Sequence, residues 1–293
     1  MDTKNIYTYH IIAILTVAVW GLTFISTKIL LGAGLSPQDI FLMRFSIAYI
    51  GIWFISPKKL FSKSWRDELW MVAAGVTGGS FYFLSENTAL EYTQTNNVAF
   101  LITTAPLFTA FLSAIAYKNE KITWKLAVGS VVALIGVALV VYNGSFVLNL
   151  SPVGDILTLL AALSWAFYSL VMRRLLPRYS ATFITRKIFF YGLLTILPCF
   201  AFRHFHVSLA VLMQPVVLFN LLFLGVIASL VCYLVWNIVL HKLGTICASN
   251  YIYLNPMVTM IGAVLLLGEQ VTVVALIGSA LILAGVFVAE KKW

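Results

Sequence analysis

The chain has 293 residues, of which 61% are hydrophobic and only 10% are charged, and its mean hydropathy is +0.98. Soluble domains carry about 25% charged residues, so this composition excludes an ordinary soluble protein and indicates an integral membrane protein. The net charge of +9 does not point to nucleic acid, because the cations lie in short segments between apolar runs.

Ten apolar runs follow one another along the chain. A helix needs about 20 residues to cross the hydrocarbon core of a bilayer, so each run predicts one transmembrane helix. The runs are residues 9–31, 38–56, 68–90, 94–117, 124–142, 154–175, 180–202, 214–240, 245–267 and 271–289. The count depends on two narrow breaks, at 91–93 and at 268–270. The predicted fold is an all-α integral membrane protein with ten transmembrane helices.

The positions of Lys and Arg support this count. When the amino terminus is placed in the cytoplasm, nearly all of the 19 cations lie in or beside cytoplasmic segments. Only Arg203 falls in an external segment, and Lys28 and Arg44 lie within spans near their external ends. This bias is typical of the positive-inside rule, so we expect a multi-pass protein with both termini in the cytoplasm.

The second half of the sequence repeats the first about 150 residues later. Aligned pairs include Trp20 with Trp165, Gly75 with Gly225, Asn87 with Asn237, and Pro106 with Pro256. Each half contains an odd number of predicted spans, so the two halves cross the membrane in opposite senses. The sequence therefore predicts two inverted five-helix repeats, residues 1–145 and 146–293.

Several short motifs lie at particular places in these repeats. They are Trp20-Gly21 and Trp165-Ala166, the segment Phe41-Leu42-Met43-Arg44-Phe45, the blocks around Pro106 and Pro256, Gly268-Glu269 with Thr272, and Asn119-Glu120 with Thr123. In this order the motifs resemble the drug/metabolite transporter superfamily, in particular its ten-helix EamA-type exporters. The first half keeps the acid of the Gly-Glu pair but lacks its glycine. The resemblance implies export of small metabolites by a bacterial inner-membrane protein.

Charged residues inside spans are the first candidates for a binding site. A central charge costs about 2.5–3.5 kcal/mol on insertion scales, so such residues face the bundle interior or water. Glu86 is predicted to bind a cationic group or exchange a proton, or alternatively to hydrate at the outer interface, paired with Arg44 or Lys28. Arg44 either binds an anionic substrate group or joins helices and headgroups.

Uncharged polar and aromatic residues in the spans complete the predicted cavity. They are Trp20, Asn87, Asn97, Trp165, Tyr168, Asn237, Asn250, Tyr253 and Asn255. The two tryptophans fall near mid-span, where they either stack on a substrate or pack in the interior. Pro106 and Pro256 predict kinks that act as gates or as permanent bends. Glycines at seven-residue spacing in the fifth and tenth spans predict close helix packing, with dimerisation as an alternative.

No nucleophile elbow, phosphate loop or metal-ligand motif is present, so we expect no catalysis, cofactor or metal. The expected function is a secondary carrier that exports a small metabolite, such as an amino acid, by alternating access. Its expected partners are a small-molecule substrate and the lipid bilayer, without nucleic acid, and the chain is a monomer or a homodimer. The alternatives are a proton-coupled exporter of drugs and cationic compounds, a passive channel and an intramembrane enzyme.

Overall fold

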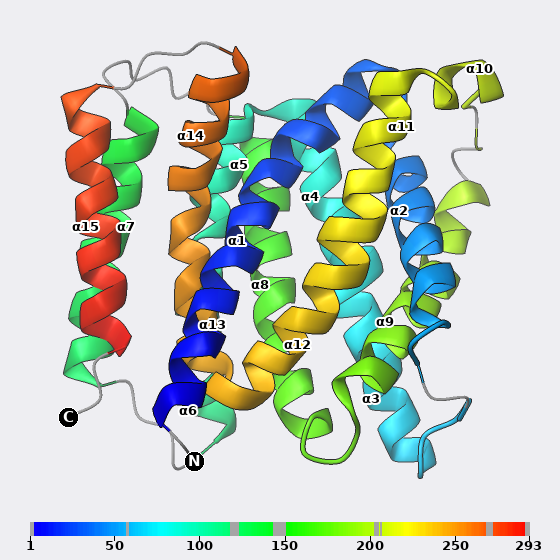
Figure 1. Ribbon diagram of the computed structural model, residues 1–293, viewed down its shortest axis with the longest axis horizontal. Helices are drawn as coiled ribbons and strands as arrows, with labels where there is room; N and C mark the ends of the chain where they lie inside the picture. Colours follow the sequence, from blue (N-terminus) through cyan, green and yellow to red (C-terminus); the bar gives the residue numbers. More distant parts are fainter. Residues whose placement is uncertain are drawn as a thin grey trace.

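The structure, a computed structural model, describes residues 3–56, 59–117, 123–142, 151–201, 205, 207–267 and 272–290. Every regular element in these ranges is a helix, which confirms the predicted all-α fold (Figure 1).

The first half of the chain follows the predicted spans closely. Its elements are α1 (Thr3–Gly32), α2 (Pro37–Ile52), α3 (Trp65–Gly75), η1 (Val76–Ser80), α4 (Phe81–Tyr92), α5 (Thr95–Ile102), α6 (Ala105–Ala116) and α7 (Trp124–Tyr142). The third predicted span comprises α3, η1 and α4, and the fourth comprises α5 and α6. The narrow break between them is real, because Thr93 adopts an extended conformation with φ −136° and ψ 173°.

The second half contains the remaining elements. They are α8 (Pro152–Leu175), α9 (Ala181–Ile196), η2 (Leu197–Ala201), α10 (Leu209–Leu212), α11 (Pro215–Leu222), η3 (Phe223–Val231), α12 (Cys232–Leu243), α13 (Thr245–Asn250), η4 (Tyr251–Leu254), α14 (Asn255–Leu267) and α15 (Val273–Glu290). The eighth span comprises α11, η3 and α12, and the ninth comprises α13, η4 and α14. The second narrow break, with Gly268-Glu269, lies outside the described residues, as does Glu120.

Serine side chains start several of these helices. Ser36, Ser64, Ser151 and Ser180 each accept a hydrogen bond from a backbone N–H in the first turn of the helix that follows. A proline also opens α2 and α8, where its missing N–H costs no helical hydrogen bond. These local signals explain why the helix boundaries lie close to those read from hydropathy.

Length and composition suit a bilayer. In the part of the chain that the structure describes, five stretches reach at least 18 residues with enough apolar character to cross a membrane, namely Ile6–Gly32, Asn97–Ala116, Pro152–Leu175, Ala181–Ala201 and Pro215–Leu243. Shorter apolar helices are Trp124–Val140 and Leu276–Ala289. Large apolar side chains such as Leu15, Phe111, Ile135, Phe219 and Leu276 are more than half exposed. Lipid is the solvent that such a surface requires.

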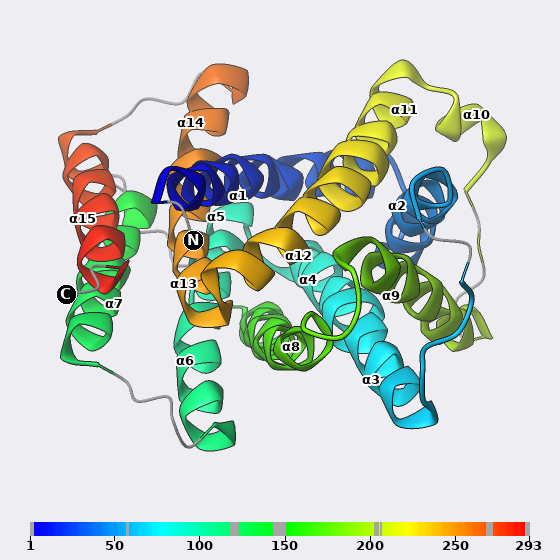
Figure 2. The ribbon, with the colours of Figure 1, turned by 60° about the horizontal axis from the view of Figure 1, so that its bottom comes forward.

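The first and last helices start and finish at the same end of the molecule. Figure 1 shows α1 rising from the lower end of the view and α15 descending to it. Both views show α7 and α15 side by side at one edge of the bundle (Figure 2).

Glycines allow the backbones of α7 and α15 to touch. A Cβ atom added at Gly136 would lie 2.6 Å from the carbonyl oxygen of Gly278 and 2.6 Å from the backbone nitrogen of Ile282. Gly129 and Gly285 face each other in the same way, seven residues away from Gly136 and Gly278 along the two helices. The glycine stripe predicted from the sequence therefore packs within one chain, as small residues do between membrane helices.

Replacing Gly136 by alanine is expected to destabilise the protein by about 1–3 kcal/mol, because the added methyl group must push two backbones apart. The matched control is Gly32→Ala, since a Cβ at Gly32 meets nothing within 4 Å. Thermal unfolding in detergent measures both variants. Equal melting temperatures for Gly136→Ala and Gly32→Ala would contradict the close contact.

Candidate functional site

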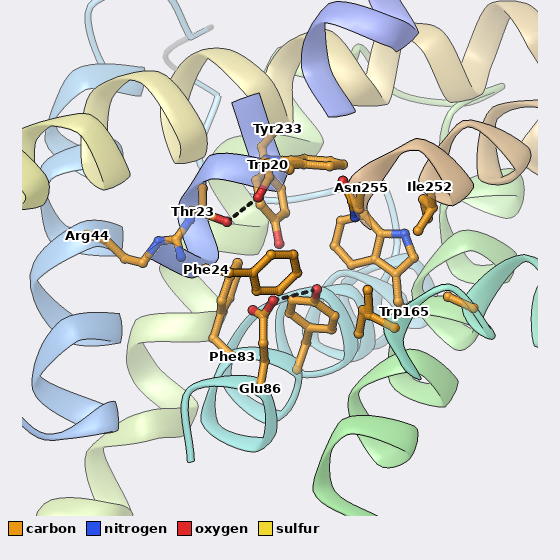
Figure 3. Close-up of a pocket in the computed structure, with 13 residues that line it drawn as sticks. Trp20, Thr23, Phe24, Arg44, Phe83, Glu86, Trp165, Tyr233, Ile252 and Asn255 are labelled. Carbon is orange, nitrogen blue, oxygen red and sulfur yellow. Dashed lines mark hydrogen bonds between the residues drawn. The ribbon is translucent and has the colours of Figure 1, made fainter. Parts of the chain in front are cut away.

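A cavity lies between helices of both halves of the chain (Figure 3). It is lined by Trp20, Thr23, Phe24, Arg44, Tyr82, Phe83, Glu86, Ile102, Ala105, Trp165, Tyr233, Ile252 and Asn255. The lining joins α1, α2 and α4–α6 of the first half to α8, α12, η4 and α14 of the second.

Two opposite charges face this cavity from different helices, as Figure 3 shows. Glu86 is only 5% exposed, and its Oε1 accepts a hydrogen bond of 3.3 Å from the Tyr82 hydroxyl. Arg44 is 1% exposed; its Nε donates to Ser229 Oγ at 2.9 Å, and its guanidinium lies 4.2 Å from the centre of the Phe83 ring. Ion pairs of the described residues include Asp67 with Arg178 and Glu68 with Lys187, but none joins Glu86 to Arg44.

Aromatic rings form much of the remaining wall. The rings of Trp20 and Trp165 meet edge to face with centroids 5.3 Å apart, and Tyr82 lies 5.0 Å from Trp165. Tyr233 lies 5.9 Å from Trp20. The two mid-span tryptophans therefore line the cavity and pack against each other, and their stacking on a substrate stays a prediction.

Two predicted cavity residues form a hydrogen-bond chain beside the cavity rather than its lining. The Tyr168 hydroxyl donates to Asn237 Oδ1 at 2.5 Å, and Asn237 Nδ2 donates to Thr185 Oγ1 at 2.8 Å. All three side chains are fully buried. The chain links α8, α12 and α9, which indicates a structural connection between helices.

Three further predicted amides and Tyr253 also lie outside the lining. Asn87 donates to the carbonyl oxygen of Pro37 at 3.3 Å, and Asn97 donates to Thr93 Oγ1 at 3.2 Å. Asn250 and Tyr253 are buried in and beside the interruption of the ninth span. Of the predicted site residues, the cavity brings together Trp20, Arg44, Glu86, Trp165 and Asn255.

Both prolines stand just after an interruption of their span. Residues 103–104 form a turn between α5 and α6, and Pro106 lies in the first turn of α6. In the ninth span the 3₁₀ segment η4 precedes α14, whose second residue is Pro256. Ile102 and Ala105 line the cavity on the two sides of the first interruption. Ile252, within η4, and Asn255, at the start of α14, line it at the second. The predicted kinks are therefore next to the cavity, as a gating role would require.

A polar cluster connects the amino-terminal end of α3 to α9 and to the segment before it. The Asp67 carboxylate accepts hydrogen bonds of 2.9 Å from the Tyr179 hydroxyl and from Arg178, and these partners hold its pKa below the usual value. Glu68 pairs with Lys187, which is only 5% exposed. The sequence places Lys187 among the cations in or beside cytoplasmic segments. In the structure it forms a buried salt bridge.

Sequence reasoning missed several residues of the cavity wall, including Phe24, Tyr82, Phe83 and Tyr233. An aromatic residue in an apolar span carries no signal of its own, because most such residues face lipid or neighbouring helices. Within the described residues, no three His, Cys, Asp or Glu side chains gather at a spacing that could hold a metal ion.

Asn255 lines the cavity and Asn237 lies beside it, and replacing them is expected to affect stability to different degrees. Asn237→Leu leaves the buried Tyr168 hydroxyl without its acceptor and removes one of the two hydrogen bonds of the Thr185 hydroxyl, and this should cost about 1–3 kcal/mol. Asn255→Leu should cost less, because the Asn255 Oδ1 atom has no hydrogen-bond partner among the described residues. Unfolding midpoints in detergent test the order, and a larger loss for Asn255→Leu would refute it.

Comparison with known proteins identifies relatives along the whole chain. An uncharacterized transporter of Archaeoglobus fulgidus is 28% identical over 287 residues and covers 97% of each chain. A probable terminal-alkyne amino-acid exporter of Streptantibioticus cattleyicolor is 25% identical, covering 95% of this chain and 92% of its own. A probable amino-acid metabolite efflux pump of Escherichia coli K12 is 24% identical, with coverages of 95% and 93%.

A solved crystal structure has the same fold, with a TM-score of 0.72 at 17% identity over 98% of this chain and 97% of the other. The sequence profile of the EamA-like transporter family, which has a ten-helix membrane fold, matches twice, over residues 8–142 and 152–290. These two matches cover nearly every helix that surrounds the cavity. The chain therefore belongs to the EamA-like transporter family.

Proposed function

We propose that this transporter exports a small amino-acid-like metabolite through the cavity by alternating access. The observation that carries the proposal is the pair of buried charges, Glu86 and Arg44, on the neighbouring helices α4 and α2 of one aromatic cavity. Relatives named as amino-acid exporters support the same substrate class.

Burial makes these two charges informative. An ionised group in a low-dielectric interior is costly unless a partner of opposite charge compensates it. Glu86 and Arg44 form no direct ion pair, although each lies within range of the other's charge, and each has one neutral hydrogen-bond partner. A zwitterion would supply both missing charges, with its ammonium group at Glu86 and its carboxylate at Arg44. The rings of Trp20 and Trp165 would contact its apolar part.

Alternating access is supported by the arrangement of the two halves. Both halves contribute to the cavity wall, and the spans beside it are interrupted near Pro106 and Pro256. Two repeats that cross the membrane in opposite senses can rock about a shared central site and open it to each side in turn. We assign the repeats to residues 1–145 and 146–293, and the protein to the bacterial inner membrane.

A second candidate function follows from Glu86 alone. A buried carboxylate beside aromatic rings also suits a cationic compound, and its protonation could drive exchange with protons. In that case Arg44 serves only to join α2 to η3 through Ser229. Glu86→Gln should then flatten the pH dependence of transport, and parallel pH curves for the variant and the parent would discard proton exchange at Glu86.

Transport assays on the charge variants distinguish these candidates. In proteoliposomes, Glu86→Gln and Arg44→Gln should each raise the KM for a transported neutral amino acid by about tenfold to a hundredfold, because each removes a charge-assisted contact. For a transported monovalent organic cation only Glu86→Gln should matter. Glu91→Gln is the matched control, since Glu91 is an exposed carboxylate of the same helix. Unchanged KM values in both cavity variants would refute the zwitterion site.

Both termini are expected on the cytoplasmic side. Short epitope tags at residues 1 and 293 should be protected from protease in intact spheroplasts and cleaved in inverted vesicles, because α1 begins and α15 ends at one end of the bundle. An external loop tag after residue 34 serves as the opposite control. Cleavage of one terminal tag in intact spheroplasts would overturn the inverted-repeat assignment.

A further inference from the structure

Two π-helical segments interrupt matching spans in the two halves. The alignment of Gly75 with Gly225 places η1, Val76–Ser80, on residues 226–230, which lie inside η3, Phe223–Val231. A π-helical turn widens the backbone spiral and is frequent at functional sites. Its recurrence at aligned positions makes it a feature of the duplicated design.

The backbone hydrogen bonds confirm both interruptions. The N–H of Phe81 bonds to the carbonyl oxygen of Val76, and the N–H of Cys232 bonds to that of Ile227, each five residues back. Gly79 adopts φ −128° and ψ −105°, outside the helical range. The regular pattern of bonds four residues back is thus broken at corresponding places in the third and eighth spans.

Aromatic side chains from the opposite half bond to these two segments. Trp20 Nε1 donates to the carbonyl oxygen of Ala228 at 3.0 Å, and the Tyr233 hydroxyl donates to that of Gly78 at 2.5 Å. Gly78 and Ala228 are themselves an aligned pair, so the two hydrogen bonds are reciprocal. The donor rings lie 5.9 Å apart and both line the cavity.

A third donor reaches the first segment from outside the cavity lining. Ser164 Oγ donates to the carbonyl oxygen of Thr77 at 2.7 Å. Ser164 belongs to α8, which is the counterpart of α1 in the second half. The first helix of each half therefore donates a hydrogen bond to the π-helical segment of the other half. Because Ser164 does not line the cavity, its hydrogen bond can be removed without removing a contact with substrate.

We propose that Trp20 and Tyr233 are positioning residues that couple the contents of the cavity to the two π-helical segments. Without substrate, their hydrogen bonds hold both segments in the observed geometry. A substrate that contacts the indole and phenol rings displaces their N–H and O–H donors from Ala228 and Gly78. Both interrupted spans are then released to bend at the same depth, which is a movement that alternating access requires. This inference rests on the proposed transport function.

Hydrogen exchange of the full chain in lipid nanodiscs, measured without substrate, tests the reciprocal bonds. Tyr233→Phe should accelerate amide exchange by about fivefold to tenfold over residues 76–81 and leave 227–232 unchanged. Trp20→Phe should give the reverse pattern. Ser164→Ala should accelerate residues 76–81 only. Its matched control is Ser169→Ala in the same helix, where Ser169 Oγ bonds to the carbonyl oxygen of Trp165. Equal acceleration of both segments, or of neither, would overturn the proposal.

Transport kinetics test the coupling itself, with radiolabelled L-phenylalanine as the first probe, followed by other neutral amino acids. Ser164→Ala should change the maximal rate at least about fivefold while KM stays within twofold, because Ser164 does not line the cavity. Ser169→Ala should retain the parent's maximal rate. A parental rate in both Ser164→Ala and Tyr233→Phe would refute coupling. A parent that transports no amino acid counts against the proposed function, whereas the exchange pattern still decides the reciprocal bonds.

Discussion

The constraint that shapes this structure is the lack of water in the hydrocarbon core, where every backbone N–H and C=O needs a partner within the protein. Interruptions of a span are tolerated only where side chains replace the missing helical bonds. Thr103 and Thr104 donate to carbonyls of the preceding turn at 2.6 and 2.7 Å, at the interruption before Pro106. Trp20 and Tyr233 do the same for the π-helical segments. Because these partners lie in the interior, the interruptions gather around the cavity.

The same constraint distinguishes two arrangements of buried charge. Lys187 is buried, but Glu68 neutralises it and receives a second hydrogen bond from Tyr191. Glu86 and Arg44 are buried to a similar degree, but their hydrogen bonds go to neutral side chains and no ion pair joins them. The cost of burial is thus met by an ion pair at the end of α3, and in the cavity the proposed zwitterion would meet it.

Hydropathy predicted the spans well because bilayer thickness fixes the length of each run, whatever its neighbours. Even the break at residues 91–93 followed from a few polar residues. The cavity was harder to predict. Glu86 stood out because a charge in a span is costly, whereas Tyr233 resembles any other aromatic residue of an apolar helix. Asn237 and Tyr168 were polar and central, but which interior face they occupy depends on helix packing. The π-helical segments have no hydropathy signal at all.

The duplicated frame carries unequal chemistry in its two halves. The alignment that pairs Asn87 with Asn237 also pairs Phe83 with Tyr233 and Glu86 with Trp236. Only Tyr233 has a hydroxyl to donate to Gly78, whereas Phe83 presents its ring to Arg44. Trp20 Nε1 donates to Ala228, but its counterpart Trp165 Nε1 has no partner among the described residues. A pair of identical halves would surround the cavity with matching groups on both sides. Divergence instead puts the carboxylate, the guanidinium and the unpaired indole N–H at different points of one wall, an asymmetry that suits the proposed substrate with two different ends.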